Sequence, residues 1–153
     1  MDFIDLKSQQ ARIRESIERR IQAVLDHGQY IMGPEISDLE GVLSEHLGCK
    51  HTIGVSSGTD SLLIALMALG IGPGDEVITV SYTWISTAEV IALLGATPVF
   101  VDIEEDTWNM NPELLASAIT DRTKAIMPVH LFGNAVNMTL IKSLANKYDL
   151  KVI

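Results

Sequence analysis

A run of small polar residues at positions 56–60, Ser-Ser-Gly-Thr-Asp, carries the clearest chemical signal in the sequence. The β-branched segment before it, Thr52–Val55, is expected to form a strand, and the apolar segment after it predicts a helix over residues 58–70. The first backbone N–H groups of such a helix lack helical partners and the helix dipole adds partial positive charge, so a phosphate would bind there. A second interpretation stays open, in which Ser57 or Thr59 caps the helix and no ligand binds.

Further polar and aromatic residues follow three other predicted strands. These strands are Glu76–Val80, Thr97–Val101 and Lys124–Val129. Trp84 follows the first strand, Asp102 the second and His130 the third. Ligands of an open parallel sheet collect outside the carboxyl ends of its strands, so we expect these side chains to meet at one edge. A flat aromatic ligand with a phosphate would use this edge, although Trp84 also fits a place in the hydrophobic core.

The elements that position these residues alternate between strand and helix after about the first 50 residues. Hydrophobic spacing, caps and glycine stops predict helices over residues 7–27, 34–47, 58–70, 84–94, 112–119 and 137–148. Lys151–Ile153 predicts the opening of a further strand. This alternation indicates an α/β fold with a mainly parallel sheet and helices on both faces. Because the 58–70 helix is apolar almost all round, we expect it to be buried against the sheet.

The same pattern divides the chain into two parts. We expect residues 1–48 to form an N-terminal helical segment and residues 49–153 to form an incomplete α/β domain. A native chain seldom ends in the first half of a buried strand, because unpaired edge groups would remain. The chain is therefore expected to be truncated relative to its natural length.

Composition and charge argue against several classes of protein. The formal net charge is −9, with an isoelectric point of about 4.7 and no basic stripe, which argues against nucleic-acid binding. A hydrophobic content of 47% fits a sheet that is buried on both faces. The sequence opens without a signal-peptide pattern, and no apolar run approaches the roughly 20 residues that a membrane span needs. We therefore expect a cytoplasmic protein without a nucleic-acid partner, a membrane partner or a metal site.

Seven short segments together carry a family pattern across the whole chain. They are Phe3–Leu6, Tyr30–Glu35, Ser57–Leu62, Gly70–Ile78, Thr83–Glu89, Gly95–Val99 and Pro128–Gly133. In this order and at this spacing they resemble motifs of the DegT/DnrJ/EryC1/StrS family of nucleotide-sugar aminotransferases, which depend on pyridoxal 5'-phosphate (PLP). The resemblance implies that the chain is the N-terminal portion of the large domain of a fold-type-I, aspartate-aminotransferase-like PLP enzyme.

The resemblance also implies roles for five residues at the cofactor. Gly58, Thr59 and Asp60 would bind the cofactor phosphate mainly through backbone N–H groups, with the Asp60 carboxylate turned away toward the helix N-terminus. Trp84 would stack on the pyridine ring, where the family more often has Phe or Tyr. His130 would lie near the cofactor edge, and a hydrogen-bonded structural histidine is an equal alternative.

The resemblance assigns fewer residues of this chain to substrate binding than to the cofactor, and none to catalysis. Ile31, Met32 and Gly33 resemble a segment that borders the sugar-nucleotide pocket. A PLP transaminase needs a lysine as Schiff-base carrier and an acid on the pyridinium nitrogen. The resemblance places both beyond Ile153, so we assign no catalytic residue and do not expect this chain alone to catalyse transamination. The lysines that match no catalytic motif are Lys7, Lys50, Lys124, Lys142, Lys147 and Lys151.

The activity that the resemblance implies is transfer of an amino group from glutamate to a keto-sugar nucleotide, carried out by a cytoplasmic homodimer. The opening segments resemble members that act on 3-keto uronic-acid sugars in surface polysaccharide or amino-sugar biosynthesis. Two alternatives stay open. One is a PLP-dependent sugar dehydratase or a regulatory relative without the lysine, and the other is a non-enzymatic α/β domain that binds a phosphate or nucleotide.

Overall fold

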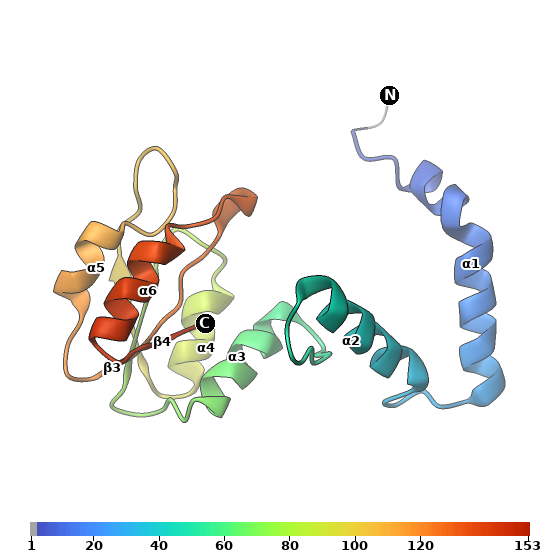
Figure 1. Ribbon diagram of the computed structural model, residues 1–153, viewed down its shortest axis with the longest axis horizontal. Coiled ribbons are helices and arrows are strands. Elements are labelled where there is room, and N and C mark those ends of the chain that lie inside the picture. The colour runs from blue at the N-terminus through green and yellow to red at the C-terminus, as the bar shows by residue number, and fades with distance from the viewer. Residues whose placement is uncertain (1–2) are drawn as a thin grey trace. The chain divides into compact units, whose positions relative to one another are not determined.

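The computed structural model describes residues 3–153, in two compact units that divide between Gly54 and Val55. The first unit contains the helices α1 (Leu6–His27) and α2 (Pro34–Leu47), blue to teal in Figure 1. Both begin and end within one residue of the predicted bounds. Among the described residues, no helix is both long enough and apolar enough to cross a membrane.

The predicted strand at Thr52–Val55 is wrong. Residues 52–55 form no strand, and polar groups of Thr52 and Gly54 pair with α2. The Thr52 hydroxyl accepts a hydrogen bond from Ser44 at 2.9 Å, and the Gly54 amide donates to the Glu40 carboxylate at 2.7 Å. The β-branched composition suggested a strand, but a strand also needs a neighbouring strand to pair with, and side chains of α2 take part of that role.

The second unit, Val55–Ile153, is an α/β layer structure. Its strands are β1 (Glu76–Val80), β2 (Thr97–Val101), β3 (Thr123–Ile126) and β4 (Lys151–Val152). They form one sheet in the order β2-β1-β3-β4, and every pair is parallel. The helices are α3 (Gly58–Ala68), α4 (Ser86–Leu93), α5 (Pro112–Ala118) and α6 (Met138–Lys147), with a short 3-10 turn, η1, at Leu131–Gly133. The predicted fold class is therefore confirmed, and β1 and β2 have the predicted bounds.

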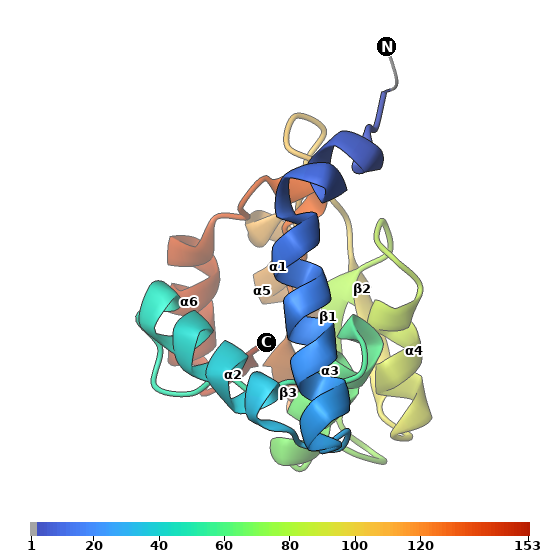
Figure 2. The same cartoon turned by 90° about the vertical axis from the view of Figure 1, so that its right-hand side faces the viewer.

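The sheet is covered on both faces, as predicted. One face packs against α5 and α6 through a cluster that includes Ile78, Leu115 and Ile141. The other packs against α3 and α4 through Leu66 and Ile91. Figure 2 shows α4 on one side of the sheet and α5 and α6 on the other.

The expected burial of α3 is only partly correct. Leu66 is completely buried and Leu62 and Leu63 are partly buried, whereas about half of the Ile64 and Met67 side chains is exposed. An apolar helix buries only the part of its surface that contacts neighbouring elements. Within this unit α3 contacts α4 and the sheet on one side only.

A side-chain hydrogen bond from Thr79 links β1 to the chain just beyond β3, and a substitution at Thr79 tests its contribution to stability. Its side chain is completely buried, and its hydroxyl donates a hydrogen bond of 2.9 Å to the carbonyl of Met127 just beyond β3. The Thr79→Val substitution keeps the shape but removes the donor, so it should lower the free energy of unfolding by about 1–2 kcal/mol. The measurement is urea denaturation of the protein.

The matched control is Thr97→Val, since Thr97 is exposed on β2. This substitution should change the free energy of unfolding by no more than about 0.5 kcal/mol. Equal losses in the two variants would contradict the role assigned to the Thr79 hydroxyl.

Candidate functional site

The candidate site lies at the carboxyl edge of the sheet, where the loops after β1, β2 and β3 begin. The connection from α3 to β1 turns at Gly70–Asp75, so α3 runs back along the sheet and its first turn lies at this edge. Helix α4 follows β1 and therefore also begins there (Figure 1). Two helix N-termini, each with unpaired backbone N–H groups, thus point toward the same edge of the parallel sheet.

The first turn of α3 leaves two amides available for a ligand. Ser57 is the N-cap, and its hydroxyl accepts a hydrogen bond from the Asp60 amide at 3.2 Å. The Gly58 and Thr59 amides have no hydrogen-bond partner among residues 3–153. A Cβ built on Gly58 would have no neighbouring atom within 4 Å, so the space above this residue is open. The predicted cap is confirmed at Ser57, and it leaves room for an anion beside it.

Asp60 is held by the residues that precede the helix. Its carboxylate accepts hydrogen bonds from the hydroxyls of Ser56 and Ser57. These bonds, that of Ser56 first and that of Ser57 second, lower the pKa of Asp60 from its ordinary value of 3.8. The carboxylate is therefore ionised and engaged at neutral pH, and the Asp60 amide already binds the cap. Of the three predicted phosphate-binding amides, those of Gly58 and Thr59 remain free to donate.

A pair of hydroxyl groups joins the first turns of the two helices. The Thr59 hydroxyl donates a hydrogen bond of 3.0 Å to the hydroxyl of Ser86, the first residue of α4. Ser86 is buried, so this contact fixes the start of α3 against the start of α4. The sequence analysis did not single out Ser86, because spacing alone does not show which hydroxyl pairs with Thr59.

Trp84 lies in the loop between β1 and α4, two residues before Ser86. Its side chain is 76% exposed, so the interpretation as a core residue is wrong. The indole leaves a large apolar face open at the edge that carries the α3 amides. An exposed indole at this edge can stack on the face of a flat ligand.

His130 is exposed and has a structural hydrogen bond. Its Nδ1 accepts from the Val136 amide at 3.2 Å. In the neutral ring the proton is therefore on Nε2, which is left to donate. Asp102, which also follows a strand, uses its carboxylate locally, accepting from the Ile103 amide at 2.8 Å.

The predicted sugar-pocket residues belong to the first unit, in the turn between α1 and α2. Ile31 and Met32 are strongly exposed, and Met32 has a left-handed φ of 52°. Gly33 is the N-cap of α2, and a Cβ there would lie 2.5 Å from the Gln29 carbonyl oxygen. Only glycine fits this turn without a shift of the backbone.

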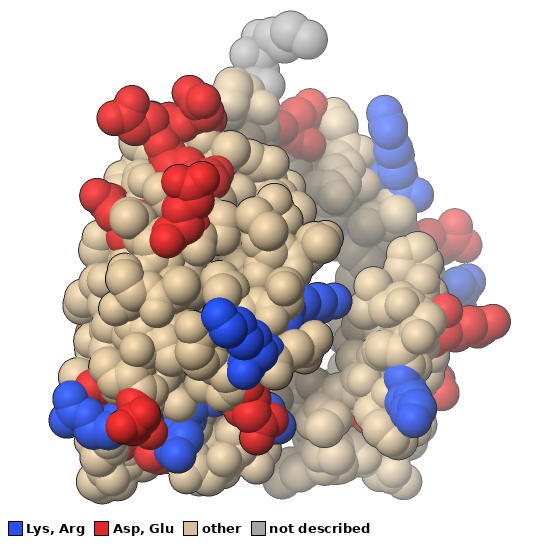
Figure 3. Space-filling view, turned by 60° about the vertical axis from the view of Figure 1, so that its left-hand side comes forward, with Lys and Arg blue, Asp and Glu red and all other residues tan. Residues whose placement is uncertain are grey.

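Three residues at the carboxyl edge were missed by the sequence analysis. Tyr82 and Trp108 form a tilted aromatic pair with ring centroids 5.3 Å apart. Asn109, the residue after Trp108, is buried. None belongs to a periodic pattern, because they lie in loops. The loop that contains Trp108 also carries four acidic residues between positions 102 and 106, and Figure 3 shows acidic side chains gathered at this end of the unit.

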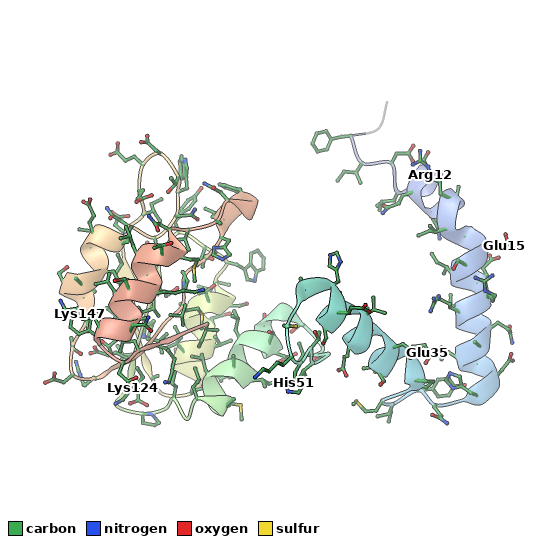
Figure 4. The ribbon with its side chains drawn as sticks, viewed as in Figure 1. Arg12, Glu15, Glu35, His51, Lys124 and Lys147 are labelled. Carbon is green, nitrogen blue, oxygen red and sulfur yellow. The ribbon has the colours of Figure 1, made fainter. Side chains whose placement is uncertain are left out.

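No lysine of the second unit belongs to the edge loops, which span residues 81–85, 102–111 and 127–137. Lys124 is near the start of β3, and Lys147 is the last residue of α6, so both lie toward the opposite edge (Figure 4).

Comparisons with known proteins show which proteins this chain resembles. The chain is 54% identical over 153 residues to a Pseudomonas aeruginosa UDP-2-acetamido-2-deoxy-3-oxo-D-glucuronate aminotransferase, covering 100% of this chain and 43% of that protein. Its structure matches that of a DegT DnrJ EryC1 StrS aminotransferase from Brucella abortus with a TM-score of 0.94 and 45% identity, covering 99% of this chain and 43% of the other.

A Bacillus subtilis structure of NtdA with bound cofactor PMP (pyridoxamine 5'-phosphate) matches with a TM-score of 0.88 and 40% identity, covering 90% of this chain and 32% of the other. The chain thus spans less than half the length of these relatives. The pattern of the DegT/DnrJ/EryC1/StrS aminotransferase family matches residues 11–153, which confirms the resemblance seen in the motifs. The chain therefore belongs to the DegT/DnrJ/EryC1/StrS aminotransferase family.

Proposed function

We propose that the full-length protein is a PLP-dependent aminotransferase that transfers an amino group from glutamate to a keto-sugar nucleotide. The observation that carries this proposal is the first turn of α3, where the free Gly58 and Thr59 amides lie below open space at the edge that also exposes Trp84. A phosphate fits the amides and the helix dipole, and an aromatic ring fits the indole. When bound, PLP supplies an electron sink for chemistry at the amino-bearing carbon.

Each site residue then has a defined task. Gly58 and Thr59 bind the phosphate through their amides, and Ser86 orients the Thr59 hydroxyl beside it. Trp84 contacts the face of the ring and excludes water from it. His130 lies near the cofactor edge with Nε2 as its free donor. The Asp60 side chain, engaged by two serine hydroxyls, stays with the helix start and does not contact the phosphate.

The relatives support one substrate class. The Pseudomonas aeruginosa relative is named for a UDP-linked 3-oxo sugar acid, and this chain is 54% identical to it. We assign the same class to this protein, in surface polysaccharide or amino-sugar biosynthesis, with Ile31, Met32 and Gly33 bordering the sugar pocket. The protein would act as a homodimer in the cytoplasm, with residues 1–48 as an N-terminal helical segment and 49–153 as part of the PLP-binding domain.

The lysine and the acid that transamination needs would follow Ile153 in the full-length protein. Two observations support this placement. The edge loops of the described second unit contain no lysine, and the chain covers 43% of the Pseudomonas aeruginosa relative. A relative in which another residue replaces the lysine would bind PLP without forming a Schiff base to the protein.

The full-length protein should turn yellow with PLP and lose the yellow band when glutamate is added. Trp84→Ala should weaken PMP binding by about tenfold, because an aromatic stack contributes roughly 0.5–1.5 kcal/mol beyond its buried area. Absorption spectroscopy and a PMP titration give both values. Tyr148→Ala, which changes an exposed aromatic residue after α6 toward the opposite edge, is the control and should bind PMP as the unmodified protein does. Absence of any protein-bound band after free PLP is removed would contradict the proposed function.

Gly58→Ala separates a phosphate site from an ordinary helix cap. The added methyl group meets no atom within 4 Å, and the φ of Gly58 is not positive, so thermal stability should hardly change. The methyl group would nevertheless enter the space assigned to the phosphate, so affinity for PMP should fall at least about tenfold.

Gly72→Ala is the matched control for this variant. The nearest atom to its added methyl group is the Leu94 carbonyl oxygen at 3.9 Å, and Gly72 lies in the loop before β1, at the opposite edge. This variant should bind PMP normally. Equal PMP affinity in Gly58→Ala and the unmodified protein would show that the first turn of α3 does not hold the phosphate.

A further inference from the structure

Asn109 is a buried polar residue that connects two loops at the carboxyl edge. It lies between β2 and α5 and is 2% exposed. Its Oδ1 accepts a hydrogen bond of 3.2 Å from the Leu131 amide, and its Nδ2 donates one of 3.0 Å to the Asn134 carbonyl. Both ends of the side-chain amide are therefore used on the main chain of the loop after β3.

The loop that Asn109 holds has an unfavourable backbone. Within η1, Phe132 has a left-handed φ of 56°, and its side chain is 80% exposed. A bulky residue keeps such a conformation only where surrounding contacts impose it. The two Asn109 bonds bracket Phe132, at Leu131 and Asn134. The next contact along the chain is the one from the Val136 amide to His130 Nδ1.

The backbone of Asn109 is held by hydrogen bonds within its own loop. Its carbonyl accepts from the Glu104 amide at 2.9 Å, and its amide donates to the Thr107 hydroxyl at 3.2 Å. An antiparallel bridge between Ile103 and Met110 closes the same loop. These contacts fix the backbone of Asn109, so its side chain can hold the loop after β3 in one position.

We propose that Asn109 is a positioning residue, which holds the 130–134 segment so that His130 keeps Nδ1 on the Val136 amide and offers Nε2–H to the bound cofactor. Asn109 does not itself contact the cofactor. This inference rests on the proposed function, because it takes His130 to lie at the cofactor edge. The loop placement, however, can be measured without a cofactor.

The test compares Asn109→Ala with Asn111→Ala in the full-length protein. Asn111 is a neighbouring asparagine that caps α5 by accepting from the Glu113 amide at 2.9 Å, and it makes no bond to the loop after β3. Both variants should lose thermal stability, since one loses buried hydrogen bonds and the other a helix cap. Loss of stability alone therefore decides nothing, and two local readouts are needed.

The first readout is amide hydrogen exchange of the peptide that covers residues 130–136, followed by mass spectrometry without added cofactor. Asn109→Ala should speed this exchange by about tenfold or more, and Asn111→Ala should leave it unchanged. The second readout is the dissociation constant of PMP, which should rise at least about fivefold in Asn109→Ala only. Values for Asn109→Ala that equal those of Asn111→Ala would overturn the inference.

Asn109→Asp gives a second test if the alanine variant does not fold. The aspartate keeps an acceptor for the Leu131 amide but places an oxygen against the Asn134 carbonyl. Amide hydrogen exchange should therefore become faster between Asn134 and Val136, and it should change less at Leu131. Unfolding of both variants would make Asn109 a general stability residue and would also overturn the inference. Failure of the unmodified protein to bind PLP would instead overturn the proposed function, and the exchange result would stand.

Discussion

Parallel pairing of β1 with both β2 and β3 is the constraint on which the rest of the second unit depends. Parallel strands require a crossover between them, so each helix returns along the sheet and every loop after a strand opens at one edge. This geometry brings the first turn of α3, the start of α4 and the loop with His130 to the same edge. The Thr59–Ser86 hydrogen bond then fixes two helix starts against each other.

The proposed phosphate site would attract an anion through local dipoles and not through net charge. The chain carries a formal charge of −9, and acidic residues crowd the loop after β2. The edge loops of the described second unit contain neither lysine nor arginine. A phosphate would therefore be bound by a pair of free amides at the start of a helix. Their hydrogen bonds and the helix dipole act over a short distance, where salt screens them only weakly. Asp60 adds a negative charge, and its carboxylate accepts hydrogen bonds from two serine hydroxyls.

Much of the fold could be predicted from the sequence, because buried parallel strands and glycine-terminated helices leave strong local patterns. The bounds of β1 and β2 follow from β-branched runs such as Glu76–Val80. Thr52–Val55 has the same composition but pairs with side chains of α2, a long-range fact that composition does not encode. The Ser57 cap and the α3 turn were predictable from local chemistry. Asn109 was not, because a polar loop residue shows its role only through its partners, Leu131 and Asn134.

A crystal structure of the full-length protein with PMP would show whether a phosphorylated pyridine lies at this edge. The phosphate oxygens should lie within hydrogen-bond distance of the Gly58 and Thr59 amides, and the pyridine ring should lie against the Trp84 indole. A phosphate bound elsewhere, with the first turn of α3 covered by protein or the Trp84 ring turned into the core, would contradict this placement.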